Sequence, residues 1–262
     1  LRLNAITKIA IIGLGKTGLS CIDYYLCRGV ELIAIDEFAA VEKQQVLLEK
    51  YPNVEFHFSP PDYGLLESVS EIVVSPGVDL RQPVLQQLIA SGKAVVGDVE
   101  IFSRQAKAPV IAITGTNGKT TVVHWLEKLL LKAGFTVKLA GNVGLPVLYL
   151  CDEPVPDYYI LELSSFQLES TFSLQAKVAA VINIEMDHLD RYDSFADYRS
   201  AKNRIYSDAE FAVFNADEND ISSEQKKSSA SFSILSNKAV YHLANNSQGS
   251  FLAKNGEPFV YS

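Results

Sequence analysis

The sequence predicts an α/β protein with two parallel sheets, a Rossmann-like N-terminal domain followed by a P-loop-type α/β domain with a small antiparallel β extension. Three observations lead to this fold class. Short apolar runs alternate with longer amphipathic stretches from residue 8 onward, which is the pattern of βαβ units. The alternation is interrupted at "KAP" (107–109) and then begins again. Two glycine-rich turns, "GLGKTG" and "GTNGKTT", each lie between a predicted strand and a predicted helix.

In residues 1–107 we expect five strands and four helices. The strands are predicted at "KIAIIG", "ELIAID", "VEFHFS", "EIVVSPG" and "AVVGD". The helices are predicted from about Thr17 to Arg28, in the charged stretch that ends at Lys50, over "PVLQQLIASG" and over "VEIFSRQA". Gly92 is a C-terminal stop for the third of these helices. Pro109 interrupts the helical pattern, so we place the domain boundary between residues 107 and 108.

In residues 108–262 a second series begins with the strand "VIAITG". The pattern predicts a helix over Lys119–Lys132, closed by Gly134, with apolar positions at Val122, Trp125, Leu126, Leu129 and Leu130. Further strands are predicted at "VKLAGN", "YYILELS", "KVAAVINI" and "EFAVFN", and a helix over 195–208. After Asp217 the short pieces "SFSIL", "VYHL", "GSFLAK" and "EPFVYS" indicate an antiparallel meander.

Composition excludes several function classes. The 23 basic and 31 acidic residues give a formal charge of -8, which leaves no broad basic face for nucleic acid. No apolar run is long enough for a membrane span or a signal peptide. The 3 cysteines lack C-x-x-C spacing, so we predict a reducing compartment, with the cytoplasm as the default.

The first glycine motif, "GLGKTG", has the context of a dinucleotide fingerprint. It follows a predicted strand, opens a helix, and precedes Asp36 at the end of the next strand, where an acid can bind a ribose hydroxyl. The motif alone leaves three interpretations open: a nicotinamide cofactor, another nucleotide or sugar nucleotide, or a purely structural turn. No hydride-transfer apparatus accompanies it in the sequence.

The second motif, "ITGTNGKTT" (113–121), indicates a nucleoside triphosphate site. A loop between a strand and a helix directs backbone N–H groups at a phosphate. Lys119 adds a charge for the outer phosphates, and Thr120 offers a hydroxyl to magnesium. The loop is shorter than the common G-x-x-x-x-G-K-[ST] form, because Ile113 stands where the first glycine is expected.

Carboxylates at two strand ends are candidate magnesium ligands. Glu162 lies in "YYILELSSFQLE", and Glu185, Asp187, His188 and Asp190 lie in "INIEMDHLDRY". The alternative for the second cluster is a solvated turn. Lys202, in "YRSAKNRIY", is predicted from spacing alone to be a surface lysine.

These motifs together resemble the Mur ligases, the ATP-dependent amide-forming enzymes of peptidoglycan precursor synthesis. "GTNGKTT", "GNVGLP", "LELSSFQLE" and "DHLDRY" occur in the order and spacing of that family, and "GLGKTGLS" with "SPGV" matches its UDP-binding first domain. The pair "LSSFQLE" and "DHLDRY" is similar to the branch that adds D-glutamate to UDP-N-acetylmuramoyl-L-alanine.

The resemblance implies roles for residues of the second domain. It implies ATP contacts across Gly115, Thr116, Asn117, Gly118, Lys119, Thr120 and Thr121, a first magnesium on Thr120 and Glu162, and a second on His188. It also implies that Lys202 is carbamylated and becomes a metal ligand, which reverses the surface interpretation. The catalytic set is then Lys119, Glu162, His188 and Lys202, and Asn142, Ser164 and Gln167 line the path of the muramoyl substrate.

In the first domain, the resemblance implies UDP contacts from Gly15, Lys16, Thr17, Asp36, Ser75, Pro76 and Gly77. One departure from the family pattern stands beside Asp36. Many members have a basic residue shortly after that position, whereas Glu37 and Phe38 stand here.

The mechanism that the resemblance implies is ATP-dependent activation of a carboxylate to an acyl phosphate, followed by attack of the D-glutamate amine. Family members continue with a further domain, so we expect this chain to be a monomeric fragment with little or no ligase activity. A nicotinamide-dependent oxidoreductase built on "GLGKTG" and a non-catalytic nucleotide-binding module are the competing interpretations.

Overall fold

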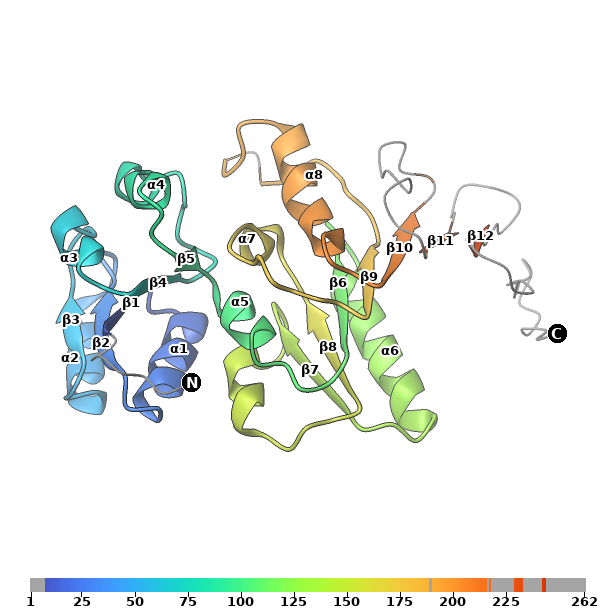
Figure 1. Ribbon diagram of the computed structural model, residues 1–262, viewed down its shortest axis with the longest axis horizontal. Helices are drawn as coiled ribbons and strands as arrows, with labels where there is room; N and C mark the ends of the chain where they lie inside the picture. The colour runs from blue at the N-terminus through green and yellow to red at the C-terminus, as the bar shows by residue number, and fades with distance from the viewer. Residues whose placement is uncertain (1–7, 189, 216, 218–228, 233–241, 244–262) are drawn as a thin grey trace. The chain divides into compact units, whose positions relative to one another are not determined.

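The computed structural model describes residues 8–188, 190–215, 217 and 229–232, and the backbone of 242–243 (Figure 1). Its contacts divide the chain into two units. Unit 1 is formed by the described part of Leu1–Gln105 together with Pro146–Glu153 and Ser170–Phe172, and the other described residues form unit 2. Two short stretches of the second predicted domain therefore pack within unit 1.

Unit 1 is built on a five-stranded parallel sheet with the order β3-β2-β1-β4-β5 (Figure 1). Its strands are β1 (Lys8–Ile12), β2 (Glu31–Ile35), β3 (Glu55–His57), β4 (Glu71–Val74) and β5 (Val95–Val96). The central strands are apolar without alternation because both faces of the sheet are covered. The parallel Rossmann-like sheet predicted from the sequence is confirmed.

Five helices accompany this sheet: α1 (Lys16–Leu26), α2 (Val41–Lys50), α3 (Tyr63–Glu67), α4 (Pro83–Ala90) and α5 (Asp98–Ser103). Leu66 of α3 and Leu88 of α4 pack on the face that carries Ile33 and Ile72. The sequence analysis did not predict α3, which is little more than one turn long. Its start is fixed by Asp62, whose side chain accepts a hydrogen bond from the backbone N–H of Leu65 at 3.1 Å.

Unit 2 contains a seven-stranded sheet with the order β12-β11-β10-β9-β6-β8-β7. Its strands are β6 (Val110–Thr114), β7 (Val137–Gly141), β8 (Tyr158–Glu162), β9 (Val178–Val181), β10 (Phe211–Asn215), β11 (Ser229–Phe232) and β12 (His242–Leu243). β11 joins β10 as a parallel strand, so the expected antiparallel meander is wrong for this strand. Within the part of unit 2 that the structure describes, β11 and β12 form the one antiparallel pair. The predicted pieces "GSFLAK" and "EPFVYS" lie outside the described residues.

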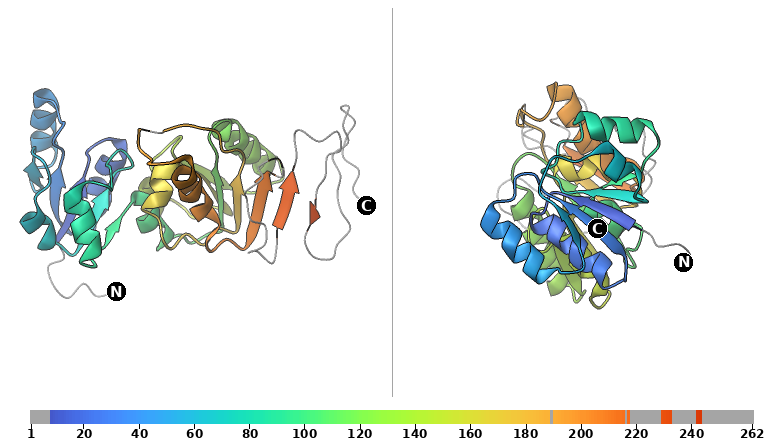
Figure 2. Two further views of the ribbon diagram at one scale, coloured as in Figure 1. Left: turned by 90° about the horizontal axis from the view of Figure 1, so that it is seen from above. Right: turned by 90° about the vertical axis from the view of Figure 1, so that its left-hand side faces the viewer.

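The helices of unit 2 lie on both faces of its sheet, as the left view of Figure 2 shows. They are α6 (Lys119–Lys132), α7 (Ser165–Glu169), α8 (Phe195–Asn203) and the 3₁₀ helix η2 (Arg204–Tyr206). A further 3₁₀ helix, η1 (Val147–Asp152), belongs to unit 1. α6 covers one face, and α7 packs with α8 on the other. Strand ends of β6, β8 and β9 are neighbours in this sheet, since Ile113 pairs with Glu162 and Thr114 with Val181.

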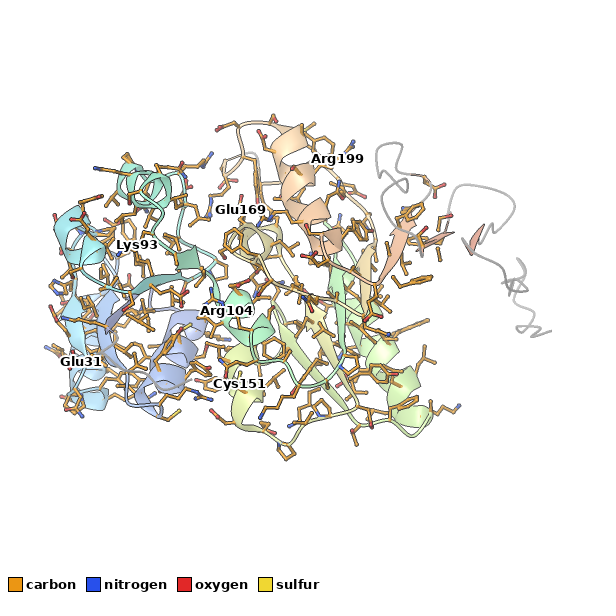
Figure 3. The ribbon with its side chains drawn as sticks, in the orientation of Figure 1. Glu31, Lys93, Arg104, Cys151, Glu169 and Arg199 are labelled. Carbon is orange, nitrogen blue, oxygen red and sulfur yellow. The ribbon has the colours of Figure 1, made fainter. Side chains whose placement is uncertain are left out.

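η1 is held in unit 1 by polar contacts to α1. Arg28 binds both carboxylate oxygens of Asp152, at 2.7 and 3.3 Å, and Tyr149 donates to Asp23 Oδ2 at 2.9 Å. Arg104, which follows α5 and is labelled in Figure 3, pairs with Glu71 of β4 at 2.7 Å. None of the three cysteines is in a disulfide. No helix among the described residues has the length and apolar character needed to cross a membrane.

Candidate functional site

The loop between β6 and α6 owes its conformation to two glycines. Gly118 has φ +77°, in the left-handed region that favours glycine. Gly115 is buried against Ile182, so a Cβ there would overlap that side chain. The helix then starts at Lys119, and the first N–H groups of a helix have no helical partners. The short loop therefore presents the N-terminus of α6 as an anion site.

Lys119 folds back over the loop that precedes it. Its Nζ donates to the carbonyl oxygens of Gly115 at 2.8 Å and Thr116 at 2.9 Å. Burial lowers the pKa of Lys119, while the charges of Glu162 and Asp187 act in the opposite direction. The ammonium group is thus held at the start of α6, where its charge adds to the positive end of the helix dipole.

Glu162 connects the loop to two neighbouring strands. The carboxylate ends β8 and is only 1% exposed. Its Oε2 accepts a hydrogen bond from Thr120 Oγ1 at 2.9 Å, and its Oε1 accepts one from Asn142 Nδ2 at 2.9 Å. The backbone N–H of Asn142 also donates to the Glu162 carbonyl at 2.8 Å. The structure therefore brings the predicted Thr120–Glu162 pair together, and Asn142 is a second partner of Glu162.

Lys202 is a buried residue of α8, with 2% exposure, so its interpretation as a surface lysine was wrong. Its Nζ donates to the Gly115 carbonyl at 2.9 Å, the same oxygen that Lys119 contacts. Burial and the nearby charge of Lys119 lower the pKa of Lys202 to about 7, although Asp187 partly opposes this. Spacing did not reveal the burial because α8 turns its Tyr198–Lys202 face inward.

His188 lies at the exposed end of the β9–α8 connection, with φ +53°. Its ring contacts Phe166 at 4.9 Å and Tyr198 at 6.0 Å between centroids, and its Nε2 lies 3.6 Å from Asp187 Oδ2. Tyr198 is 1% exposed and joins His188 to the loop. Its hydroxyl lies 3.1 Å from Thr116 Oγ1, and Lys202 Nζ lies 4.6 Å from its ring centroid.

Tyr198 was missed in the sequence analysis. Its position four residues before Lys202 on one helix face was the available signal.

The donor set of this site fits one magnesium ion better than two. Magnesium takes oxygen ligands, often one or two carboxylates completed by phosphates and water. The Thr120 hydroxyl and the Glu162 carboxylate satisfy that requirement at one place. Among the described residues, no three His, Cys, Asp or Glu side chains gather as a metal site. At His188 the described residues offer one nearby carboxylate, Asp187, whose Oδ2 lies 3.6 Å from His188 Nε2, so a second ion there would need further oxygen ligands.

Ser164 and Gln167 form a local hydrogen-bonded pair at the start of α7. Gln167 Oε1 accepts from the Ser164 backbone N–H at 3.1 Å, and Ser164 Oγ accepts from the Gln167 backbone N–H at 3.2 Å. Gln167 is 3% exposed. These bonds fix the turn that follows β8, directly after Glu162.

The glycine turn of unit 1 is closely packed. A Cβ on Gly18 would overlap the carbonyl oxygen of Gly13, and Gly13 itself has φ +85°. Ser75 Oγ donates to that same Gly13 carbonyl at 2.6 Å. Gly13 and Gly18 are therefore required by the fold of the turn, whereas a Cβ on Gly15 would meet no atom within 4 Å.

Asp36 is bonded to the turn and to a lysine. Its Oδ2 accepts from the backbone N–H of Leu14 at 3.1 Å and from Lys43 Nζ at 2.8 Å. Phe38, which stands where a basic residue was expected, is 86% exposed. Lys43 thus places a positive charge beside Asp36 from a position that the sequence analysis did not single out.

The remaining candidates surround the same end of the sheet. Lys16 and Thr17 begin α1 after Gly15, at the N-terminus of the helix, and Pro76 and Gly77 follow Ser75 after β4. Lys16 and Gly77 are exposed. Carboxyl ends of parallel strands are where ligands bind in such sheets.

Two family models match the chain. The Mur ligase middle domain matches residues 113–256, which is more than half of the chain, and the N-terminal domain of MurD-like Mur ligases matches residues 7–97. The chain belongs to the Mur ligase family. The shortened phosphate loop begins where the middle-domain match begins, so it is part of the family's fold.

Curated Mur ligases are similar over much of this chain. The UDP-N-acetylmuramoylalanine--D-glutamate ligase of Coxiella burnetii is 41% identical over 249 residues, which cover 94% of this chain and 56% of that protein. The ligase of the same name from Pasteurella multocida is 43% identical, covering 80% of this chain and 48% of its own length. The chain therefore spans about half the length of these relatives.

A solved Mur ligase shows the same fold. The UDP-N-acetylmuramate:L-alanyl-gamma-D-glutamyl-meso-diaminopimelate ligase of Neisseria meningitides superposes with a TM-score of 0.52 at 18% identity, covering 82% of this chain and 73% of that protein. At this identity the likeness concerns the fold alone. It supports the arrangement of a Rossmann-like domain followed by an ATPase-type domain.

Proposed function

We propose that the chain carries the UDP-substrate and ATP sites of a ligase that adds D-glutamate to UDP-N-acetylmuramoyl-L-alanine. The observation that carries the proposal is the cluster in which Lys119, Thr120 and Glu162 meet at the end of a parallel sheet. The identity to two ligases with this printed activity supports the choice of substrate. ATP, Mg²⁺, the two small-molecule substrates and a monomeric state in the cytoplasm all belong to the proposal.

The reaction has two steps that balance without a redox partner. The alanyl carboxylate oxygen bonds to the γ-phosphorus of ATP, the bond to the β-phosphate oxygen breaks, and an acyl phosphate and ADP result. The D-glutamate amine then bonds to the acyl carbon, the carbon–oxygen bond to phosphate breaks, and a proton leaves the nitrogen. The products are the amide, ADP and phosphate.

The residues of this chain contribute binding and electrostatics to these steps. The N-terminus of α6 receives the phosphates through its N–H groups, and Lys119 adds a charge beside them. Thr120 and Glu162 would hold the first magnesium, and such an ion would supply positive charge for phosphoryl transfer. Asn142 orients Glu162 through its side-chain amide.

Lys202 is suited to carbamylation by its surroundings. An amine reacts with carbon dioxide only when it is neutral, and a pKa of about 7 leaves a large neutral fraction near neutrality. The modification would remove the repulsion between Lys202 and Lys119 and would add a second carboxylate to that of Asp187, which lies beside His188. A second magnesium ion would then be held by His188 and these oxygens.

The UDP moiety is assigned to the glycine turn of unit 1. The N-terminus of α1 at Lys16 and Thr17 receives the diphosphate, and Asp36 lies at the next strand end within reach of a ribose hydroxyl. Asn142, Ser164 and Gln167 are assigned to the path of the muramoyl group. The hydrogen bond from Asn142 to Glu162 and the Ser164–Gln167 pair that follows Glu162 in the chain support this assignment.

A titration of the chain with MgATP, UDP-N-acetylmuramoyl-L-alanine and NADH tests the proposal. Isothermal calorimetry is expected to detect binding of MgATP and of the UDP sugar, but not of NADH. Binding of NADH without the UDP sugar would favour an oxidoreductase. Binding of MgATP without the UDP sugar would leave only a nucleotide-binding module.

A further inference from the structure

One asparagine side chain binds the phosphate loop from the segment that follows β9. Asn183 Oδ1 accepts hydrogen bonds from the backbone N–H groups of Thr116 at 3.0 Å and Asn117 at 2.8 Å. Asn183 Nδ2 donates in return to the Asn117 carbonyl at 3.0 Å. The amide therefore acts as both acceptor and donor to one short stretch of the loop.

The neighbours of Asn183 extend this contact. The Thr116 N–H also reaches the Asn183 carbonyl at 2.9 Å, and the Glu185 N–H donates to Thr116 Oγ1 at 2.9 Å. Asn117 Nδ2 donates to Glu185 Oε2 at 3.0 Å. Residues 183–185 thus satisfy polar groups of residues 116 and 117 from one side.

The hydrogen bonds from residues 183–185 to residues 116 and 117, here called the brace, restrict the conformations of this loop. Thr116 and Asn117 stand between two glycines, Gly115 and Gly118, and glycine gives an unbound loop many accessible conformations. Ordering these residues at the moment of ligand binding would cost conformational entropy. A loop that is already held in place binds more tightly because that cost has been met in folding.

We propose that Asn183 is a positioning residue of the nucleotide site, which fixes the Thr116–Asn117 stretch so that the start of α6 is presented to phosphate. The N–H groups of that stretch are occupied by Asn183 and are not offered to the anion. Phosphate contacts then come from the N–H groups at Gly118 and the first turn of α6. This inference rests on the proposed function, because it assumes that the loop binds a nucleotide.

The test compares two alanine variants of the chain. Asn183→Ala removes every side-chain bond to the loop. Asn215→Ala is the matched control, because Asn215 is 5% exposed and its Nδ2 donates to the Ile182 carbonyl at 3.2 Å, next to Asn183 but not to the loop. Calorimetry measures MgATP affinity, and amide exchange by NMR measures protection of the Thr116 and Asn117 N–H groups. Circular dichroism melts show whether each variant folds.

We expect Asn183→Ala to bind MgATP about tenfold more weakly, as the loss of one to two net hydrogen bonds implies. The Asn117 amide should exchange faster in this variant, because its hydrogen bond is to the side chain alone. The Thr116 amide keeps its hydrogen bond to the backbone carbonyl of residue 183 and serves as an internal reference. Both amides should remain protected in Asn215→Ala. Unchanged affinity and unchanged exchange in folded Asn183→Ala would overturn the proposal. An equal loss of MgATP affinity in Asn215→Ala would also overturn it, because a general effect of the segment would then explain the result.

If Asn183→Ala does not fold, a second variant tests whether the Asn183 side chain orders the Thr116–Asn117 stretch. Asn183→Asp keeps the acceptor for both N–H groups, so the two amides should stay protected. Free exchange of these amides in folded Asn183→Asp would contradict the brace. If the unaltered chain does not take up MgATP, the proposed function fails, whereas the exchange measurement still tests whether Asn183 orders the loop.

Discussion

At the scale of single residues, the unusual feature is that two lysines donate to one carbonyl oxygen. Lys119 Nζ and Lys202 Nζ lie 2.8 and 2.9 Å from the Gly115 carbonyl. Both groups are taken from water, and burial of a charged amine without a paired anion is costly. Burial in the first place, and repulsion by Lys119 in the second, lower the pKa of Lys202 to about 7. We therefore expect the protonation state of Lys202 to change with pH near neutrality.

The pH dependence of stability should change when Lys202 is replaced. Its pKa is about 7 in the folded chain and takes the ordinary value of 10.5 when unfolded. Between these values the unfolded chain binds the extra proton, so the free energy of unfolding rises with pH across that window, and the burial penalty is fully present below pH 7. Urea unfolding at about pH 7 and pH 9 measures the effect.

Lys202→Met is the comparison for this prediction. The free energy of unfolding of the variant should exceed that of the unaltered chain most near pH 7. The difference should become smaller as pH rises. A stability difference that stays constant between the two pH values would show that Lys202 does not titrate in this range.

Thr120→Val should weaken MgATP binding, because it removes both a candidate metal ligand and the hydrogen bond to Glu162 at 2.9 Å. The loss of one charge-assisted hydrogen bond implies a factor of about ten or more. Thr120→Ser keeps the hydroxyl and serves as the control in calorimetric titrations. Equal MgATP affinities in the two variants would show that the Thr120 hydroxyl does not contribute to nucleotide binding.

The residues of the site differ in how far the sequence could predict them. Lys119, Thr120 and Glu162 follow from a strand, a loop and a helix that are adjacent in sequence or in sheet order. Lys202 was misjudged from spacing, because its burial depends on how α8 packs against the loop. The family resemblance implied a carbamylated metal ligand there, which stays a proposal. Asn183 gave no signal, since an asparagine after a strand is common in turns.

At the scale of secondary structure elements, α6 has two different apolar faces. Val123 is fully buried, and Leu126 and Leu130 pack beside it on Ile111 and Ile160. Trp125 and Leu129, which the periodicity assigned to the same stripe, are 68% and 63% exposed. The apolar pattern therefore predicted the helix correctly but did not identify which face meets the sheet.

Substitutions on the two apolar faces of α6 should differ in their effect on the free energy of unfolding. Val123→Ala is expected to lower the free energy of unfolding by roughly 1–3 kcal/mol, because it leaves a cavity against the sheet. Leu129→Ala removes more carbon atoms, but it should change the free energy of unfolding by about 0.5 kcal/mol or less, because substitutions at exposed positions have small effects. Urea denaturation monitored by circular dichroism compares them. A larger loss for Leu129→Ala would mean that the burial of α6 is misassigned.

Element boundaries were predictable where a glycine or a cap marks them. The range of α6 was predicted from Lys119 to Lys132, and Gly134 has the expected positive φ of +91°. β11 was misjudged, because alternation alone does not distinguish a parallel edge strand from a hairpin strand. Its pairing with β10 is a non-local property of the sheet.

At the scale of the whole molecule, the two units each carry a glycine turn at the start of a helix. Unit 1 has the turn before α1, and unit 2 has the loop before α6. The family models match 7–97 and 113–256, and the boundary between residues 107 and 108 stays a prediction. The return of η1 to unit 1 could not be read from the sequence, because it depends on contacts such as that of Tyr149 with Asp23.

The assignment of the nucleotide site to unit 2 and of the UDP-sugar site to unit 1 is tested most directly by two single substitutions. One lysine is replaced in each unit, and both ligands are titrated by calorimetry. Lys119→Ala should lose MgATP binding and keep UDP-N-acetylmuramoyl-L-alanine binding, because its charge lies at the start of α6. Lys16→Ala should show the reverse pattern, since it stands at the start of α1. Retention of MgATP affinity in Lys119→Ala, or loss of both ligands from either single substitution, would contradict the assignment of separate nucleotide and UDP-sugar sites.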